Sequence, residues 1–432
     1  MKRRYVAAIA VIAALIIAGC SSSGGGSKQQ AGGGSRNRTL TVWLMDGSAP
    51  KQLVADLNAE FQSSHPGVTV NYQIQQWNGI QDKLTTALAG NSTPDVIELG
   101  NTQSAKFAAS GGLLDLTGKV ADLGNQNWLK GMTESGQWDG KQFAVPFYSA
   151  NRFVVYRTDL FKAAGINQPP TSIDQWIQDG QKLAAANRSN PRFTALYLPG
   201  QAWYVLASLI WDQGGNLAVK NGDKWQGAVD TPQALAGIRT YEQIYKAMSK
   251  APADTDEATP QQNEVFAKGD VGMMIALPWE ANGALAANKK LTGKIGTFPI
   301  PSHTAGQTAP VFLGGSDLAI PAGSANKGLA YDWVKLMLSE KYQTRLAKEN
   351  GAIPASANLG QSVLGNDPLL GSMVKSSANG EITPNDPTWA AVEAGANPLK
   401  DMMTKILSGK ASVDQAAREA SGLITQKMAS SS

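Results

Sequence analysis

Alternating apolar positions and helical apolar stripes follow one another from Thr39 onward. Leu40, Val42 and Leu44 alternate with polar residues, as expected of a half-buried strand. The later segments are a helical stripe over residues 53–61, a second alternating strand over 68–74, a helix over 80–88 and an apolar strand over 94–99. This βαβαβ order predicts a parallel α/β sheet covered by helices, with ligands at the carboxyl ends of its strands.

The second half of the chain is predominantly helical in pattern. Thr171-Ser172 precedes an amphipathic stripe and predicts a helix N-cap, and residues 202–211 form an apolar helix. Residues 271–277 alternate as a buried strand, which Pro278 ends, and a further helix is expected from Ala281. Residues 387–428 are also predicted to be helical.

The first 38 residues have a different pattern. Lys2, Arg3 and Arg4 precede an uncharged apolar run of 13 residues, Val6–Ala18, which is shorter than the roughly 20 residues of a membrane span and predicts a secretion signal over residues 1–19. The single cysteine, Cys20, follows Ala18-Gly19 and resembles the lipidated cysteine of a bacterial lipobox. Residues 20–38 are rich in Gly and Ser and predict a flexible tether.

Charge and composition exclude several classes of function. The formal net charge of +4 falls to +1 when the three basic residues of the first 19 are left out, and no basic cluster follows, so a nucleic-acid partner is not expected. The 11 tryptophans suggest aromatic binding surfaces as well as core. About 390 residues after the tether are too many for one core and predict two domains.

Residues for catalysis are sparse. The two histidines, His65 and His303, lie far apart in sequence, no thiolate is available in the body, and no zinc or nucleotide-binding motif is present, so no cofactor or metal is expected. Glycoside hydrolysis needs only two carboxylates, and Glu280 and Asp317 are the pair to test for it. A secreted carbohydrate-active enzyme is therefore the alternative function.

Several short motifs, in order along the chain, together resemble the family 1 extracellular solute-binding proteins, which are the carbohydrate receptors of bacterial ABC importers. The motifs are Thr41-Val42-Trp43, His65-Pro66, Pro94-Asp95-Val96, Gly112-Leu113-Leu114-Asp115-Leu116, Gly140–Pro146, Val155–Phe161, Ala267–Met273, Gly314-Gly315, Ala330–Trp333 and Gly351–Ala355. Each motif is weak alone, and their common order behind a lipobox makes the resemblance specific.

The resemblance implies a two-lobed periplasmic-binding-protein-like clamshell with discontinuous domains joined by a hinge. We expect lobe 1 to comprise residues 39–149 and 312–356, and lobe 2 residues 150–311 and 357–432. The chain is expected to cross between lobes near 147–152, 309–314 and 354–360, and the apolar segments Phe143–Phe147 and Phe153–Tyr156 are expected to form a hairpin at the hinge.

A sugar site needs flat aromatic side chains together with polar groups that donate and accept hydrogen bonds. The candidates lie on loops after predicted strands: Asp46, Ser48, Trp77, Asn101, Gln103, Tyr148, Asn151, Trp203, Trp279, Glu280, Gly315, Ser316 and Asp317. For Trp203, the sequence is equally compatible with a side chain in the core and a side chain in the cleft. The tryptophans assigned to packing are Trp43, Trp176, Trp211, Trp225, Trp333 and Trp389, and Asp95 is also assigned a structural role.

These observations predict a monomeric receptor, lipid-anchored outside the cell membrane of a Gram-positive type cell, which delivers a di- or oligosaccharide to the permease subunits of an ABC importer and is not an enzyme. The segments Glu98–Gln103 and Trp43-Leu44-Met45 resemble receptors for chitobiose-type amino sugars. This ligand ranks ahead of maltose-like and xylobiose-like sugars.

Overall fold

The N-terminal βαβαβ prediction is confirmed. A computed structural model describes residues 38–90 and 93–430, so Cys20, the signal segment and the tether up to residue 37 lie outside the described residues. The elements are β1 (Arg38–Met45), α1 (Lys51–Ser64), β2 (Val68–Gln75), α2 (Ile80–Ala89) and β3 (Val96–Gly100). Strand β1 pairs in parallel with both β2 and β3, so their carboxyl ends lie at one edge of the sheet.

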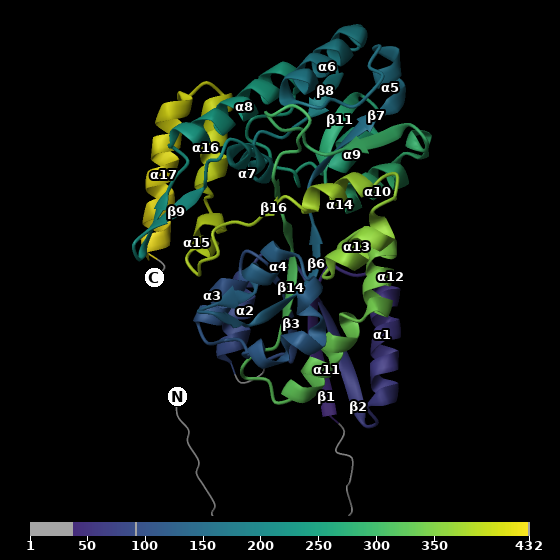
Figure 1. Cartoon of the computed structure of the whole chain (residues 1–432), viewed down its shortest axis with the longest axis vertical. Helices are drawn as coiled ribbons and strands as arrows, with labels where there is room; N and C mark the ends of the chain where they lie inside the picture. The colour runs from purple at the N-terminus through teal and green to yellow at the C-terminus, as the bar shows by residue number, and fades with distance from the viewer. Residues whose placement is uncertain (1–37, 91–92, 431–432) are drawn as a thin grey trace, which may run out of the picture. The chain divides into compact units, whose positions relative to one another are not determined.

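Three later strands extend this sheet to six. They are β6 (Ala144–Ala150), β14 (Gly314–Ala319) and β15 (Ile353–Pro354), and the strand order is β15-β6-β14-β3-β1-β2. Because β14 runs antiparallel to β3 and β6, its first residues lie at the edge where β1, β3 and β6 end. Helices α11 (Lys327–Met337) and α12 (Glu340–Asn350) pack with α1 over one face, where Phe61, Trp333 and Tyr342 are fully buried (Figure 1). We call this half of the molecule lobe 1.

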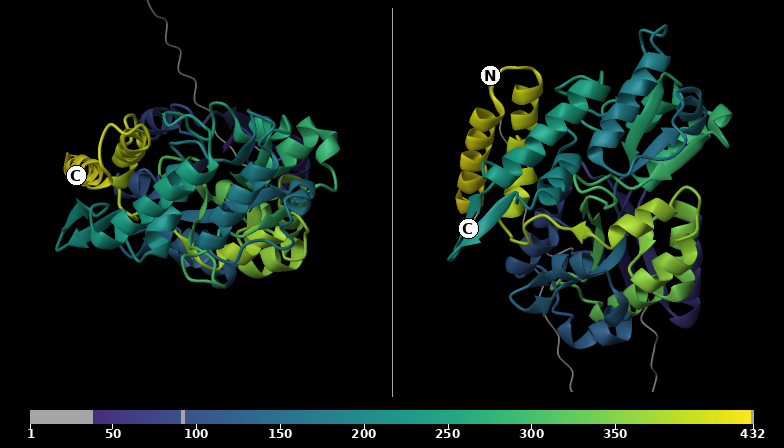
Figure 2. Two further views of the ribbon diagram at one scale, coloured as in Figure 1. Left: turned by 90° about the horizontal axis from the view of Figure 1, so that it is seen from above. Right: turned by 45° about the horizontal axis from the view of Figure 1, so that its top comes forward.

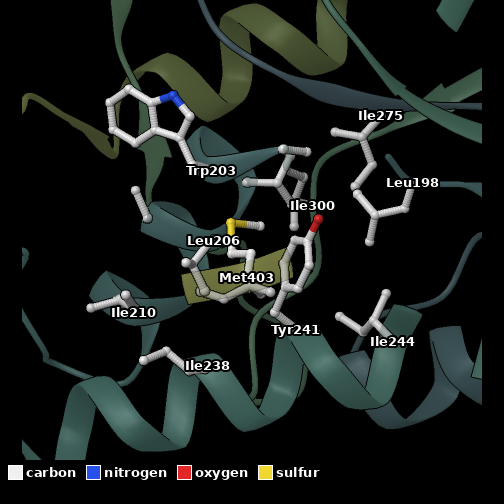
Figure 3. Packing of buried hydrophobic residues seen from close by; sticks show 14 of the residues in the cluster. Leu198, Trp203, Leu206, Ile210, Ile238, Tyr241, Ile244, Ile275, Ile300 and Met403 are labelled. Carbon is white, nitrogen blue, oxygen red and sulfur yellow. The ribbon is translucent and has the colours of Figure 1, made fainter. Parts of the chain in front are cut away.

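A second sheet of four strands has the order β12-β7-β11-β8. Its strands are β7 (Phe153–Arg157), β8 (Thr194–Tyr197), β11 (Val271–Ala276) and β12 (Ile295–Phe298). Its largest core contains Trp176 and Trp389, and Figure 3 shows Leu206, Tyr241 and Met403 meeting within it. We call this half lobe 2. The C-terminal helices α16 (Pro398–Leu407) and α17 (Val413–Ser430) also belong to lobe 2 and lie side by side in Figure 2.

The prediction of a hairpin at the hinge is wrong, because the two segments do not pair with each other. Strand β6 pairs with β14 and β15 in lobe 1, whereas β7 pairs with β11 and β12 in lobe 2. Each strand is internal to its own sheet and therefore apolar on both faces, which explains why the two segments resembled partners. Only Asn151 and Arg152 separate them, so the chain passes directly from one sheet into the other. The residue boundaries of the two lobes stay a prediction.

Local sequence signals account for the helix ends. Ser172 caps α6 (Ile173–Ala186) by accepting a hydrogen bond from the Gln175 N–H, as predicted. The helix expected from Ala281 begins earlier: α10 spans Pro278–Ala287, because Pro278 takes the first helical position, which needs no N–H donor. The tail is helical as predicted, in α15 (Trp389–Glu393), α16 and α17.

The remaining elements are short or cover the sheets. The helices are α3 (Ser104–Ala109), α4 (Lys130–Ser135), α5 (Thr158–Ala163), α7 (Trp203–Asp212), α8 (Pro232–Met248), α9 (Gln262–Ala267), α13 (Ala357–Leu364) and α14 (Gly371–Ser377), with 3-10 turns at Thr117–Leu123, Asn125–Asn127 and Lys289–Leu291. The strands are β4 (Gln137–Trp138), β5 (Lys141–Gln142), β9 (Ala218–Asn221), β10 (Lys224–Gly227), β13 (Val311–Phe312) and β16 (Gly380–Glu381). Within residues 38–90 and 93–430, no helix is long and apolar enough to cross a membrane.

Candidate functional site

The predicted site residues of lobe 1 gather at one edge of its sheet, on the loops after β1, β2 and β3 and within the adjoining parts of β6 and β14. The expectation that all of them lie on loops is wrong for Tyr148, which lies within β6, and for Gly315, Ser316 and Asp317, which lie within β14. The Asp46 N–H donates to the Gln75 carbonyl at 2.8 Å, which joins the ends of β1 and β2. The Asn101 N–H donates to the Gly315 carbonyl at 3.1 Å, which joins the end of β3 to the start of β14. Strand β6 ends at this edge and leads through Asn151 and Arg152 into lobe 2. This is the edge where an open α/β sheet binds its ligands.

A buried carboxylate organises the loop that follows β1. Glu98 is fully buried and accepts hydrogen bonds from the Met45 N–H (2.7 Å) and the Ser48 hydroxyl (2.6 Å). Tyr148 lies 3.2 Å from the same Ser48 hydroxyl and accepts a hydrogen bond from the Ser316 hydroxyl at 3.3 Å. Burial raises the pKa of Glu98, and the neighbouring hydroxyls partly oppose this. We call these five residues the Glu98 network.

The Glu98 network changes the role expected for three candidates. Ser48, Tyr148 and Ser316 are all buried, and their hydroxyls hydrogen-bond to one another or to Glu98. They therefore hold the loop Asp46–Ser48 in place. Sequence reasoning did not select Glu98 as a site residue. The available signal was an acidic residue in the middle of an otherwise apolar strand, Val96–Leu99.

Two of the 11 tryptophans are exposed, and both belong to the predicted site. Trp77 follows β2 and is 42% exposed, and Trp279 lies in the first turn of α10 and is 43% exposed. The Trp77 ring packs over Gly100, where an added Cβ would lie 3.4 Å from the ring atom Cζ3. An indole that rests on protein through one part of its surface and exposes the rest can stack on a flat ligand.

The polar candidates at the site differ in which of their side-chain atoms lack a hydrogen-bond partner. Asp46 is exposed, and its carboxylate has no hydrogen-bond or ion-pair partner in the part of the chain that the structure describes. The Asn101 side chain donates to the Leu313 carbonyl at 2.9 Å and joins the site to a second crossing segment. The side-chain oxygen of Gln103 is buried without a hydrogen-bond partner, as is that of Asn151. Such oxygens can accept hydrogen bonds from a bound hydroxyl or water.

Lobe 2 contributes a cluster centred on Arg152. Its guanidinium forms two hydrogen bonds with Glu257, at 2.6 and 2.7 Å, and lies 4.8 Å from the Tyr204 ring centre. Tyr204 in turn stacks on Phe312, with ring centres 4.2 Å apart, so it connects the crossing at residues 151–152 with the one at 311–313. Sequence reasoning did not select Arg152, Glu257 or Phe312, because long-range pairing of this kind leaves no local pattern.

The tryptophans assigned to packing are covered as expected. Trp176, Trp333 and Trp389 are fully buried, and Trp43, Trp211 and Trp225 are partly buried within the lobes. For Trp203 the structure favours the core position, because the side chain is only 5% exposed and belongs to the lobe 2 core. Figure 3 shows its indole at the margin of that cluster. Asp95 is structural as predicted, since its carboxylate accepts hydrogen bonds from the Thr41 N–H and the Ser324 hydroxyl.

The carboxylate pair considered for glycoside hydrolysis belongs to two separate networks. Glu280 accepts hydrogen bonds from the Leu277 N–H and the Gln262 amide, each at 2.7 Å, and so caps α10. Burial, reinforced by repulsion from Glu257, raises the pKa of Glu280 to about 7. Asp317 is fully buried in lobe 1, where it accepts from the Ser104 hydroxyl at 2.6 Å and the Ser135 hydroxyl at 3.2 Å. A hydrolase needs both groups on one scissile bond, and this geometry does not favour that.

One further contact joins the two lobes at the site. The Thr102 hydroxyl, on the loop after β3, donates to Glu393 of α15 at 3.0 Å, and the Trp389 indole donates to the same carboxylate at 2.7 Å. Burial raises the pKa of Glu393 to about 7. Within the described residues, no group of three or more His, Cys, Asp or Glu side chains could hold a metal ion.

The molecule has two α/β lobes that are joined by short crossings. Exposed indoles and polar groups lie at the sheet edges where the lobes meet. This architecture is that of a two-lobed solute-binding protein. The chain belongs to the bacterial extracellular solute-binding protein family, whose family model matches residues 43–344. It is 41% identical over 391 residues, or 90% of each chain, to the protein named diacetylchitobiose binding protein DasA of Streptomyces coelicolor.

Solved structures agree with this assignment. The sugar-binding protein MalE from Xanthomonas citri superposes with a TM-score of 0.80 over 91% of this chain and 98% of that one, at 22% identity, and supports the fold. The GacH receptor of Streptomyces glaucescens, solved without ligand and with acarbose, superposes with a TM-score of 0.77 over 92% of this chain and 100% of that one, at 25% identity. The family and these relatives are binding proteins.

Proposed function

We propose that this protein captures a short oligosaccharide outside the cell and delivers it to the permease subunits of an ABC importer. The observation that carries the proposal is the placement of Trp77 and Trp279. Both indoles are exposed where the sheets of the two lobes end, and exposed aromatic faces are what a pyranose ring requires. Asp46, Gln103 and Asn151 provide the accompanying oxygen acceptors. A binding role without catalysis agrees with the separate networks of Glu280 and Asp317.

We infer that the ligand is a chitobiose-type amino sugar, ahead of maltose-like and xylobiose-like sugars. The 41% identity to a protein named for diacetylchitobiose binding supports this order. Relatives at lower identity include a probable ABC transporter-binding protein of Deinococcus radiodurans, at 24% identity over 73% of this chain and 76% of that protein, which supports the importer partnership.

A thermal-shift panel tests the ligand. The full chain is melted with N,N′-diacetylchitobiose, maltose, xylobiose and the matching monosaccharides. A sugar present at about 100 times its Kd adds about 2.7 kcal/mol to the free energy of unfolding, which raises the melting temperature measurably. We expect diacetylchitobiose to give the largest shift. A panel in which no sugar changes the melting temperature would contradict the proposed function.

We also propose that Cys20 carries a lipid that anchors a monomeric receptor to the outer face of a Gram-positive type membrane. Its position directly after Ala18-Gly19, behind the apolar run, supports this. Cys20→Ala is expected to move the protein from the membrane fraction to the medium while the thermal shift with sugar is unchanged. Retention of the variant in the membrane fraction would rule out the lipid on Cys20.

A further inference from the structure

A pocket of about 230 Å³ lies next to the Asp46–Ser48 loop. We call it the edge pocket. It is lined by the loop and helix start over residues 45–51, by Tyr72 and Ile74 of β2, and by Asn350 at the end of α12. Ser48 is not among its lining residues because its hydroxyl bonds to Glu98, whereas Asp46 and Gly47 form part of the pocket wall. The edge pocket and the predicted site therefore share one loop.

Three polar side chains of the edge pocket, those of Asp46, Lys51 and Tyr72, are free to bind a ligand. Neither the exposed carboxylate of Asp46 nor the exposed ammonium of Lys51 has a hydrogen-bond or ion-pair partner in the described part of the chain, and the same holds for the Tyr72 hydroxyl. Burial, together with the nearby charges of Glu98 and Asp46, raises the pKa of Tyr72 to about 12, so its hydroxyl keeps its proton and can donate. One anion and one cation leave the pocket without net charge, which suits a neutral ligand.

Lys51 places a positive charge at the N-terminus of a helix, where acidic residues are usually preferred. It is the first residue of α1, and that first turn contains no acidic residue. A cation there meets the positive end of the helix dipole, which is unfavourable for the helix. Departures of this kind are expected where a residue serves binding.

The pocket also has an apolar side. Tyr72 and Ile74 are two residues apart on β2 and therefore lie on the same face of the strand, and Ile74 is 40% exposed. Asn350 keeps the opposite wall in place, because its amide donates to the carbonyls of Gly47 (3.2 Å) and Ser48 (3.1 Å). An aromatic ring and an aliphatic side chain facing separate donors and acceptors match the apolar faces and hydroxyl rim of a pyranose.

We propose that the edge pocket is a subsite for one further neutral pyranose ring, so that the protein prefers a trisaccharide to the corresponding disaccharide. This inference rests on the proposed function, because the shared Asp46–Ser48 loop connects the pocket to the site that binds the first rings. Tyr72 supplies the surface on which the additional ring lies, and Asp46 and Lys51 hydrogen-bond to its hydroxyls.

Calorimetric titration of the full chain tests the subsite with two pairs of probes: N,N′-diacetylchitobiose with N,N′,N″-triacetylchitotriose, and maltose with maltotriose. For the pair that binds, we expect the trisaccharide to bind about tenfold more tightly, equivalent to about 1.4 kcal/mol. Tyr72→Ala should abolish this preference while the disaccharide affinity stays within about twofold. Ile74→Ser, at a more exposed position, should act in the same direction and serves if Tyr72→Ala does not fold.

Val219→Ser is the matched control, since Val219 is an aliphatic strand residue that is 39% exposed, on β9 away from lobe 1. It should leave the preference at its wild-type value. Equal affinity of wild type for the two members of the binding pair would overturn the subsite, as would a preference that survives both Tyr72→Ala and Ile74→Ser. Both results would leave the proposed function standing. Failure of all four sugars and of xylobiose to bind wild type would instead overturn the proposed function, and the subsite with it.

Discussion

Trp279 combines high exposure with a firmly placed backbone. It follows Pro278 in the first turn of α10, where Glu280 bonds back to the Leu277 N–H, and its indole is 43% exposed. A side chain so exposed contributes little to the core, so its placement at the end of β11 points to ligand contact.

We expect Trp279→Ala to weaken sugar binding by about 1–3 kcal/mol, because a stacking surface is lost. The melting temperature of the free protein should change little. Trp333→Ala is the matched control: this tryptophan is fully buried in lobe 1, and its loss should cost about 3–5 kcal/mol of folding stability. Titration calorimetry and thermal melts measure both. A Trp279→Ala protein that melts early and binds sugar at full affinity would remove Trp279 from the site.

Asp317 links the folding of lobe 1 to pH. Burial raises the pKa of Asp317 from 3.8 to about 7, although hydrogen bonds from Ser104 and Ser135 oppose the shift. The folded protein therefore holds this proton at pH values where the unfolded chain has released it. Stability is accordingly lost as pH rises from about 4 to about 7, and it stays lower above that range.

Asp317→Asn should remove this loss, because the amide oxygen can still accept from the two serines and carries no charge. The melting temperature of the variant relative to wild type should thus increase between pH 4.5 and pH 8, by an amount equivalent to a few kcal/mol. The other buried carboxyls are present in both proteins and cancel in the difference. Parallel pH profiles for the two proteins would show that Asp317 does not titrate in this range.

The sequence was sufficient to place residues whose position depends on their neighbours in the chain. Because Pro278 cannot continue β11, Trp279 could be placed just beyond the end of that strand. The N-cap at Ser172 could be predicted in the same way. The roles of Ser48 and Ser316 could not be predicted, because their hydroxyls bond to Glu98 and Tyr148, which are between 50 and 168 residues away. Contacts across such separations form only when strands distant in sequence pair.

At the scale of elements, the contact between β14 and β6 is irregular where the site is built. The pairing register shifts between Ser316 and Asp317, which leaves Phe147 as an extra residue on β6. Such a bulge bends a strand and redirects its side chains. Gly315 lies just before this shift with φ of 149°, and an added Cβ would lie 2.2 Å from the Tyr148 carbonyl oxygen. Gly315 therefore contributes to the site through the close approach of two backbones.

Gly315→Ala should destabilise the protein by about 2–4 kcal/mol, since β14 must move away from β6 and the backbone is strained. Gly118→Ala is the control, because a Cβ there would meet no atom within 4 Å. That change should alter stability by less than about 1 kcal/mol. Urea unfolding measures both. Equal midpoints for Gly315→Ala and wild type would contradict the backbone contact.

The βαβαβ unit could be predicted because each of its strands and helices has its own apolar period. The expected hairpin of β6 and β7 failed for a related reason. Two internal strands of different sheets are both apolar on both faces, and nothing in their composition indicates which sheet each one joins. Distinguishing them required the antiparallel partners β14 and β11, which are encoded more than 100 residues later.

For the whole molecule, we expect the two lobes to close on the ligand, because bound sugar gains contacts from both sheet edges at once. Small-angle scattering should give a smaller radius of gyration at saturating sugar than without it. Wild type with a sugar that gives no thermal shift, at the same concentration, provides the unliganded control. Identical curves for free and fully saturated wild type would contradict closure.

The two-residue link Asn151–Arg152 has a mechanical consequence for such a movement. A link this short acts as a pivot, so groups move in proportion to their distance from it. Strand β2 is four strands from β6 in the sheet, about 19 Å at 4.8 Å per strand, so each degree of rotation moves the end of β2 by about 0.3 Å. Groups beside β6 hardly move. A ligand one ring longer would stop the rotation at a wider angle between the lobes. The closure angle of the bound protein would therefore depend on the length of the ligand.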